Sequence, residues 1–207
     1  MNNKFFKIVE TEKEMEIFKK IWLEVCDEKQ FETEDFHTKE TGMHFLIKNK
    51  DGDYVGTGEV GKYVNNDKST VQYYYDFSQL DEVKKEMDHT YEVDKVCIYP
   101  EYRSQGLMIN MIYALLFHQT VTNSTYYIGA MESKFFKALK RFYKVPMGEV
   151  APKQKYNDFY LHPIIMYIRD YMDTLKTNQT TNIDFSLINS IVEEYLKEKK
   201  NETITSK

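Results

Sequence analysis

The chain has 207 residues, of which 42% are hydrophobic, and this is enough for one full core with an extension. Its net charge of −5 argues against a nucleic-acid partner, because nucleic-acid-binding proteins carry an excess of basic residues. Cys26 and Cys97 lie far apart and join no histidine cluster, and the longest apolar run is about half of the roughly 20 residues that span a bilayer. We therefore expect a cytoplasmic protein without disulfides, a metal site or a membrane span.

Local signals divide the first half of the chain into short elements. Thr11 and Glu14 form a capping box, which is typical of a helix start. Gly52 follows an aspartate between two apolar runs and supplies the positive φ that a tight hairpin turn requires. The predicted elements are a strand over residues 4–9, a helix over 12–27, hairpin strands over 44–48 and 54–64, a strand or the edge of a binding surface over 70–77, and a short helix over 80–87.

The second half of the chain predicts alternating strands and helices, followed by an extension. Apolar residues recur at helical spacing in two stretches, and a run of β-branched or aromatic residues precedes each of them. The expected organisation is one domain over residues 1–170, with a linker and a C-terminal helix over 171–207 appended to it. The predicted elements are a strand over residues 91–99, a helix over 107–121, a strand over 125–131, a helix over 133–145, a mostly extended segment to about 168, and an amphipathic helix around 187–196.

The segment VCIYPEYRSQGLM, residues 96–108, joins a predicted strand to a predicted helix through a polar turn. Pro100 ends the strand, and Gly106 leaves room beside the backbone. Arg103 and Gln105 add hydrogen-bond donors. A helix N-terminus after such a turn presents unpaired N–H groups and a partial positive charge. The segment therefore predicts either a site for a phosphate or pyrophosphate, or a plain strand-to-helix turn whose glycine relieves crowding.

Two motifs resemble those of the GCN5-related N-acetyltransferases. The first is the strand, proline and loop over residues 96–108, in which Met108 stands where the family has a small residue. The second is Phe142-Tyr143 at the end of a predicted helix, followed by Gly148. The resemblance implies an α/β (α+β) fold, with a mixed, mostly antiparallel sheet flanked by helices, and an acyl-CoA donor such as acetyl-CoA. It assigns the role of general acid to Tyr143, and it assigns donor binding to the loop residues Arg103, Ser104, Gln105, Gly106, Leu107 and Met108.

A narrower resemblance concerns YEVDKVCIYPEYR, residues 91–103. This stretch is similar to the Glu-x-x-Arg-x-x-Val-x-Pro strand of acyl-homoserine-lactone synthases and of the related long-chain N-acyl amino acid synthases, with Lys95 where arginine is usual. These relatives also tolerate the loss of the last small residue of the loop, and they carry an extended C-terminal segment, here residues 156–170. The resemblance implies an alternative donor, a fatty acyl chain carried by acyl carrier protein.

Acyl transfer from a thioester to an amine needs a base, a polarised carbonyl and a proton for the leaving thiolate. Glu92 and Asp94 lie two apart on a predicted strand, hence on one face, and are the candidate bases; paired structural carboxylates are the alternative. The backbone N–H of Ile98 or Cys97, near the end of that strand, is the candidate that polarises the carbonyl. Tyr143 is the candidate acid, and a packed tyrosine with a satisfied hydroxyl is the alternative.

The remaining features leave several interpretations open. Residues 133–155 hold seven Lys/Arg against one acid, which indicates a solvated face, or a surface for the 3′-phosphate of CoA or for an acidic carrier protein. Cys97 is more typical of a buried core cysteine than of a nucleophile. We predict an N-acyltransferase that moves an acyl group from acyl-CoA to a small-molecule or peptide amine. The alternatives are long-chain transfer from acyl carrier protein and a non-catalytic binding module, and a homodimer is left open.

Overall fold

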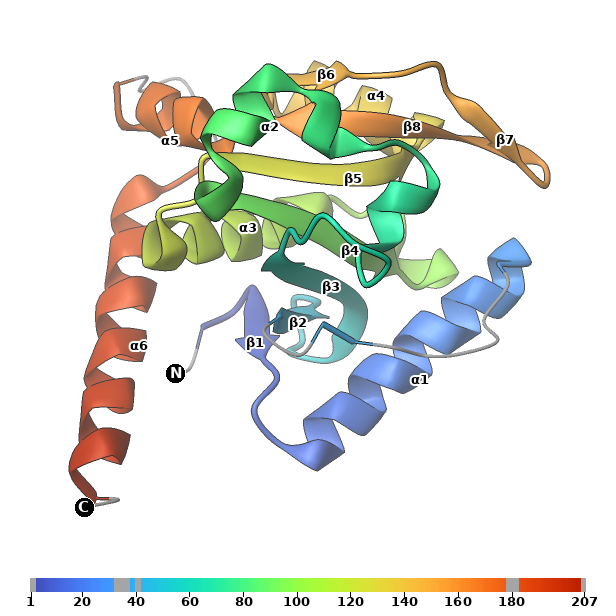
Figure 1. The fold of residues 1–207 in the computed structure, drawn as a ribbon. Coiled ribbons are helices and arrows are strands. Elements are labelled where there is room, and N and C mark those ends of the chain that lie inside the picture. The colour runs from blue at the N-terminus through green and yellow to red at the C-terminus, as the bar shows by residue number, and fades with distance from the viewer. Residues whose placement is uncertain (1–2, 32–37, 40–41, 178–182, 206–207) are drawn as a thin grey trace.

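The computed structural model describes residues 3–31, 38–39, 42–177 and 183–205, and Figure 1 shows their fold. Within these residues, eight strands form one sheet in the order β1-β2-β3-β4-β5-β8-β6, and β7 pairs with β8. All paired strands are antiparallel except β4 and β5, so the predicted mixed, mostly antiparallel sheet is confirmed. The strands are β1 (Phe6–Ile8), β2 (Met43–Lys48), β3 (Tyr54–Lys62), β4 (Thr90–Ile98), β5 (Tyr126–Glu132), β6 (Met147–Glu149), β7 (Gln154–Tyr156) and β8 (Phe159–Met166).

The local signals for turns and helix starts hold in the structure. The N–H of Glu14 donates to the Thr11 hydroxyl at 3.2 Å, and the N–H of Thr11 donates to the Glu14 carboxylate at 3.1 Å, so the capping box is confirmed. Gly52 has a φ of 91° in the hairpin turn. The helices are α1 (Glu12–Lys29), α2 (Asp81–Lys85), α3 (Met108–Thr122), α4 (Ser133–Phe142), α5 (Ile168–Thr177) and α6 (Phe185–Thr205), with 3-10 turns η1 (Thr70–Tyr73), η2 (Phe77–Gln79), η3 (Met87–His89) and η4 (Pro100–Tyr102).

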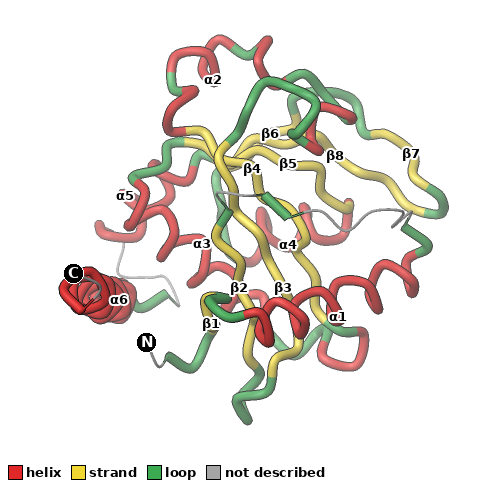
Figure 2. The backbone as a smooth tube through the Cα atoms, turned by 60° about the horizontal axis from the view of Figure 1, so that its bottom comes forward, coloured by secondary structure: helices red, strands yellow, loops and turns green. Residues whose placement is uncertain are grey.

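Helices cover both faces of the sheet. One face carries α1 and the segment from η1 to α2, and the other carries α3, α4 and α5 (Figures 1 and 2). Side chains alternate along β2 accordingly: Phe45 and Ile47 enter the core beneath α3, whereas Leu46 packs in the cluster that contains Phe18 of α1. Helix α3 is buried along most of its length because α5 and α6 pack against it.

The sheet forks between β4 and β5. Thr90, Tyr91 and Glu92 pair with residues 126–128, and no later residue of β4 pairs with β5 in the described chain. A β-bulge bends β4 just beyond this point, since Lys95 has a φ of 49° and the register against β3 shifts there. The two ribbons therefore separate toward their C-terminal ends (Figure 1). One edge of β4 is left unpaired after Glu92.

Residues 70–77 do not form the predicted strand. They form η1 and lead into η2, where an Asp76 carboxylate oxygen accepts from the N–H of Ser78 at 3.1 Å. The N–H of Val71 donates to the carboxylate of Glu92 at 3.1 Å. The strand prediction fails because side chains bind the backbone groups that a ladder would have used.

The C-terminal part also differs from its predicted organisation. The sequence did not predict α5, whose Tyr171, Met172 and Leu175 are buried in the main core. Ile188 and Ile191 of α6 belong to the same core cluster. Residues 178–182 of the predicted linker lie outside the described residues. Every helix of the described chain is too short or too polar to cross a membrane.

Candidate active site

A cleft of about 970 Å³ opens where β4 and β5 separate. Its walls come from β4, β5 and β8, from the C-terminal end of α1, from the loop before α3, and from α4. Two of the predicted site residues, Glu92 and Gln105, do not line this cleft. The predicted site residues that do line it are Asp94, Cys97, Ile98, Arg103, Ser104, Gly106, Leu107, Met108 and Tyr143.

The loop before α3 has unpaired backbone N–H groups. Ser104 and Gly106 have φ values of 64° and 79°, so the loop turns through left-handed conformations. The N–H groups of residues 104–107 donate no hydrogen bond to any residue that the structure describes. A Cβ placed on Gly106 would meet nothing within 4 Å, so the space beside its backbone is open. Consecutive N–H groups of this kind, next to a helix N-terminus, form a concave site for an anion.

The polar side chains of this loop are already engaged. The Arg103 guanidinium donates to the two carboxylate oxygens of Glu28 in α1 at 2.8 and 2.5 Å. Its Nε donates to the carbonyl of Ile98 at 2.9 Å. Gln105 Nε2 donates to the carbonyl of Glu101 at 2.7 Å, which keeps this side chain out of the cleft. The backbone N–H groups, rather than these two side chains, are therefore available to an anion.

The end of β4 directs one N–H group toward the open edge of the strand. The N–H of Tyr99 donates to the carbonyl of Val55 in β3 at 2.9 Å. Because N–H groups alternate along a strand, the N–H of Cys97 also points to β3, and that of Ile98 points to the edge left open by β5. The Cys97 thiol contacts Thr57 Oγ1 at 3.0 Å, and burial raises the pKa of this thiol to about 11. Cys97 is thus a buried core thiol.

One threonine holds Glu92 and Asp94 together. Thr70 Oγ1 lies 2.5 Å from a carboxylate oxygen of Glu92 and 2.9 Å from one of Asp94. The spacing of the two acids predicted a shared face, and the structure places them on one. The Glu92 side chain is fully buried at the fork, whereas that of Asp94 is 26% exposed and lines the cleft. Only Asp94 of the pair therefore has direct access to the cavity.

Sequence reasoning missed a further buried acid, Glu59 on β3. Its carboxylate lies 2.9 Å from His44 Nε2 and 2.7 Å from Lys95 Nζ. Burial alone would raise the pKa of Glu59, but the hydrogen bond from His44 and the charge of Lys95 lower it to about 2. The signal in the sequence was a lone acid inside the apolar, glycine-rich run VGTGEVG, where a charge needs a buried partner.

Lys95, at the bulge, connects Glu59 to the cleft. Its Nζ lies 3.3 Å from Asp94 Oδ2, and its backbone N–H donates to Asp94 Oδ1 at 2.7 Å. Burial would lower the pKa of Lys95, but the charges of Asp94 and Glu59 raise it above its ordinary value. Lys95 therefore stays protonated, and its ammonium group lies beside the Asp94 carboxylate at the cleft.

Tyr143 ends α4 and faces the cleft. Its carbonyl accepts from the hydroxyl of Tyr171 at 2.7 Å, which ties the end of α4 to α5. The Tyr143 hydroxyl forms no hydrogen bond with another part of the described chain. Burial raises the pKa of Tyr143, so the hydroxyl keeps its proton at neutral pH.

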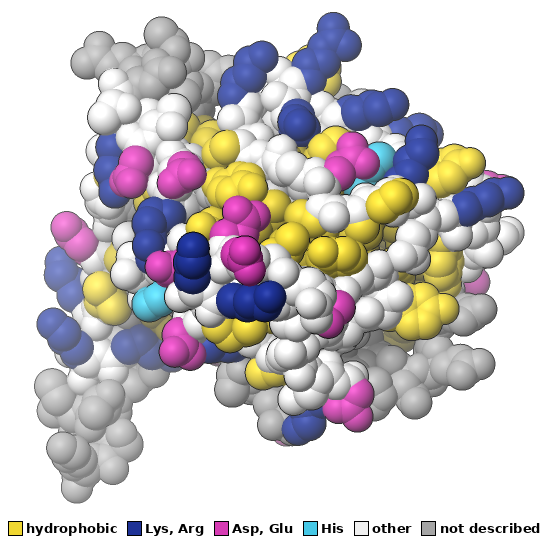
Figure 3. All heavy atoms as spheres, turned by 45° about the horizontal axis from the view of Figure 1, so that its top comes forward, with side chains coloured by type: hydrophobic (Ala, Val, Ile, Leu, Met, Phe, Trp, Pro, Cys, Tyr) yellow, Lys and Arg dark blue, Asp and Glu magenta, His cyan; other side chains and the backbone are white. Residues whose placement is uncertain are grey.

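Basic side chains gather on the outer side of α4. Figure 3 shows them toward the upper edge of the view, on the side where Figure 1 places α4 and β6. Lys134 and Phe142 line the cleft, and Phe142 is 71% exposed. The basic surface therefore borders the cavity. Its exposed residues on and just after α4 are Lys134, Lys137, Lys140, Arg141 and Lys144.

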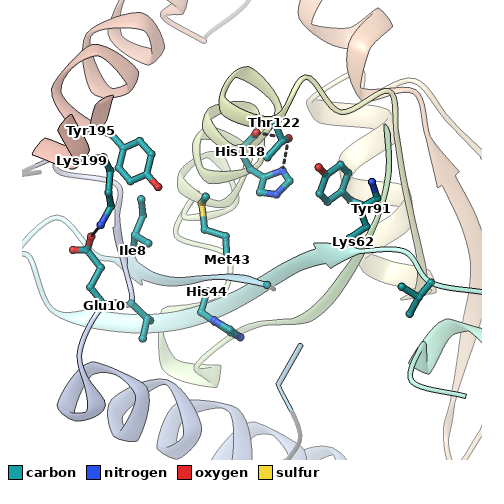
Figure 4. A pocket seen from close by; sticks show the side chains of 13 residues that line it. Ile8, Glu10, Met43, His44, Lys62, Tyr91, His118, Thr122, Tyr195 and Lys199 are labelled. Carbon is teal, nitrogen blue, oxygen red and sulfur yellow. Dashed lines mark hydrogen bonds and ion pairs between the residues drawn. The ribbon is translucent and has the colours of Figure 1, made fainter. Parts of the chain in front are cut away.

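A second cavity, of about 620 Å³, lies between the N-terminal strands, the end of α3 and α6 (Figure 4). It shares no residue with the cleft. His118 faces it, with Nδ1 at 2.7 Å from the Tyr127 hydroxyl, and burial lowers the pKa of His118 to about 3. Lys199 and Glu10 form an ion pair of 3.1 Å at its rim. None of the predicted site residues lines this cavity, so we place the candidate active site in the larger cleft.

No protein-family model and no curated protein matches the sequence, but solved structures match the fold. FeeM, an N-acyl amino acid synthase from uncultured soil microbes, has a TM-score of 0.59 at 11% identity, over 84% of this chain and 95% of that one. BjaI, a CoA-dependent acyl-homoserine lactone synthase, has a TM-score of 0.61 at 13% identity, over 84% of this chain and 89% of that one. TofI has a TM-score of 0.59 at 11% identity, over 79% of this chain and 90% of that one. The protein therefore has the fold of the GCN5-related N-acyltransferases and is similar to the acyl-homoserine-lactone-synthase-like branch of that fold.

Proposed function

We propose that this protein is an N-acyltransferase that moves an acyl group, most simply acetyl, from acyl-CoA to the amine of a small molecule or peptide. One observation carries the proposal: a single cleft joins the unpaired N–H groups of residues 104–107 to the carboxylate of Asp94 and the protonated phenol of Tyr143. Amide formation from a thioester requires an anion site for the donor, a base and an acid. The shared fold supports the proposal by analogy.

Each group has one role in the proposed mechanism. The N–H groups of residues 104–107 bind the donor pyrophosphate, and Asp94 accepts a proton from the ammonium of the acceptor. The neutral amine attacks the thioester carbonyl, whose oxygen accepts a hydrogen bond from the N–H of Ile98. The C–S bond then breaks, and Tyr143 gives its proton to the departing thiolate. The second excess amine proton is lost to solvent, Asp94 releases its proton after the product leaves, solvent reprotonates the phenolate, and no covalent enzyme intermediate forms.

Replacing Gly106 with alanine should weaken CoA binding about 10-fold, as measured by isothermal titration calorimetry. Alanine at a φ of 79° costs roughly 1–2 kcal/mol, and relief of that strain would displace the N–H groups that bind the pyrophosphate. Gly52→Ala is the matched control, because Gly52 has a φ of 91° and equally open surroundings in the hairpin turn. Both variants should lose similar stability, but only Gly106→Ala should lose affinity. Equal CoA affinity in the two would contradict the assignment of the loop.

A thermal-shift experiment should give a raised unfolding midpoint with CoA and acetyl-CoA. A ligand at about 100 times its Kd adds about 2.7 kcal/mol to the stability of a protein that binds it only when folded. Long-chain acyl-CoA and acyl carrier protein are tested beside them, and CoA release with a panel of amines follows. A higher midpoint with acetyl-CoA, together with thiol release, supports the proposal. No shift and no release with any donor would contradict it and favour a binding module.

A second candidate, long-chain transfer from acyl carrier protein, is favoured by the apolar inner wall of the cleft. This wall includes Met111, Ile164 and Met166, which also belong to the main core, so the apolar lining extends far into the molecule. The basic surface of α4 borders the same cavity and has the charge that an acidic carrier protein requires.

The carrier-protein candidate predicts that the double variant Lys137→Glu with Arg141→Glu binds acyl carrier protein at least several-fold more weakly. Both side chains are exposed on α4, and like charge at the cleft border repels an acidic partner. The matched control is Lys13→Glu with Lys50→Glu, which changes the net charge equally at two exposed positions off α4. Binding is measured at low and high salt. Equal affinity of the two double variants would argue against this donor.

A further inference from the structure

A hydroxyl bridges the two acids at the fork of the sheet. Thr70 Oγ1 lies 2.5 Å from Glu92 Oε1 and 2.9 Å from Asp94 Oδ2. Thr70 begins η1, which packs beside β5, and its side chain lines the cleft. A threonine hydroxyl carries one proton and can therefore donate to only one of two carboxylates. The other contact lacks a proton until one enters from the cleft.

The contacts around Glu92 help to decide which of the two carboxylates accepts the Thr70 proton. Its carboxylate accepts from Ser69 Oγ at 2.6 Å and from the N–H of Val71 at 3.1 Å, and Lys39 Nζ lies 3.0 Å away. The Thr70 oxygen lies closer to Glu92 Oε1, at 2.5 Å, than to Asp94 Oδ2, at 2.9 Å, so we assign the Thr70 proton to the contact with Glu92. Asp94 Oδ2 then faces a lone pair of the Thr70 oxygen. A proton between these two oxygens would complete the bridge.

Asp94 and Glu92 differ in solvent exposure, and this difference indicates a separate role for each. The Asp94 side chain is 26% exposed and lines the cleft, so it can contact the ammonium of an acceptor. The Glu92 side chain is fully buried and does not line the cleft. A proton that enters at Asp94 can pass to Glu92 through the Thr70 hydroxyl, whose oxygen touches both.

We propose that Thr70 is a proton-relay residue that passes the proton of the acceptor amine from Asp94 to Glu92, a role that rests on the acyltransferase function proposed above. The N–H bond of the ammonium breaks, and its proton binds Asp94 Oδ2. Asp94 then transfers a proton to Thr70 Oγ1 while the original Thr70 proton moves to Glu92 Oε1. Asp94 is again an anion, Glu92 is neutral, and the number of protons is unchanged. After the product leaves, the reverse steps deliver the proton to solvent in the cleft.

A lysine lies beside each acid of the bridge. Lys95 Nζ lies 3.3 Å from Asp94 Oδ2 and 2.7 Å from Glu59, and Lys39 Nζ lies 3.0 Å from Glu92. The acid that gives up the proton and the acid that receives it therefore both face a positive charge. While the amine attacks, the relay holds the abstracted proton on Glu92. The proton therefore does not return from Asp94 to the amine nitrogen.

The test compares Thr70→Val, Thr70→Ser and Ser69→Ala with the unmodified protein. CoA release from acetyl-CoA is followed with an amino acid, a polyamine and a short peptide as amines, in H₂O and D₂O mixtures. Thr70→Val should lower kcat on the order of 10²-fold with little change in KM, and Thr70→Ser should restore it. Ser69→Ala removes one donor to Glu92 but leaves the path intact, so its effect should be smaller. A plot of rate against deuterium fraction should be curved for the unmodified protein and Thr70→Ser, and linear for Thr70→Val.

The outcomes separate the relay from the acyltransferase function. If the unmodified protein releases no thiol from acetyl-CoA or long-chain acyl-CoA with any amine, both proposals are overturned. If it is active and Thr70→Val has the same kcat, the relay alone is overturned. The relay is also overturned if Ser69→Ala lowers kcat as much as Thr70→Val and both keep a curved plot, because Thr70 would then only hold Glu92 in place.

Discussion

Asp94→Asn should lower kcat for acyl transfer about 10²- to 10⁴-fold, the range by which a positioned general base accelerates a reaction. Asparagine has nearly the same shape but does not accept the proton of the ammonium. Donor binding should be unchanged, because Asp94 lies outside the loop over residues 104–107 that is assigned to the pyrophosphate. Initial rates of thiol release give kcat, and the rise in unfolding midpoint with CoA reports donor binding in the same variant.

Glu132→Gln is the matched control for Asp94→Asn. Glu132, the last residue of β5, also lines the cleft. Its carboxylate forms an ion pair of 3.2 Å with Lys29 and has no role in the proposed mechanism. Its loss of turnover should be much smaller than that of Asp94→Asn. Equal turnover in Asp94→Asn and the unmodified protein would remove Asp94 from the mechanism.

Glu59→Gln should lower the free energy of unfolding at neutral pH by about 3–5 kcal/mol, as expected when one partner of a buried ion pair is removed. The Glu59 side chain is fully buried and that of Lys95 is 8% exposed, so the variant leaves a charge without its main partner in a poorly hydrated place. Urea denaturation measures the change. The double variant Glu59→Gln with Lys95→Met should lose less than the sum of the two single variants, because Glu59 and Lys95 interact directly.

The same pair predicts a pH dependence of stability. The pKa of Glu59 falls from an ordinary 4.5 to about 2 in the folded protein, which corresponds to roughly 3 kcal/mol. A lowered pKa gives stability that is present above the unfolded value and is lost as pH falls toward the folded value. The difference between the unmodified protein and Glu59→Gln should therefore narrow as pH falls from about 5 to about 3. A constant difference over this range would show that Glu59 does not titrate as inferred.

Much of the fold was predictable because its signals are local. A capping box, a glycine with positive φ and a hydrophobic period act over a few residues, and each led to a correct element. Of the two interpretations of residues 70–77, the strand was wrong, although the aromatic run has the composition of a strand; the other, the edge of a binding surface, agrees with the place of Thr70, Val71 and Tyr74 in the cleft wall. There the N–H of Val71 binds Glu92, and Asp76 binds its own neighbours, so distant and local side chains replace the strand pairing. Composition carries no information about these partners.

In the candidate site, too, local features were predictable and long-range contacts were not. The loop over residues 96–108 and the spacing of Glu92 and Asp94 were readable because the relevant geometry lies within one strand and one turn. Thr70 and Glu59 were missed, since each becomes part of the site only through a contact with a distant strand. The side chain of Gln105 lies outside the cleft, because its amide donates to the carbonyl of Glu101. A side chain's direction in an irregular loop depends on nearby acceptors, which sequence spacing does not specify.

The sequence by itself determined most of the strands and helices up to α4, the polar, glycine-bearing turn before α3, and the two acids on one face of β4. The tertiary structure decided which charged side chains form ion pairs. Glu59 reaches Lys95 because a bulge turns β4 at that residue, and Arg103 is occupied by Glu28 because α1 lies against the loop. Local patterns act through backbone conformation and burial of one face, but a buried charge is stable only with a partner, and the register of the sheet selects that partner.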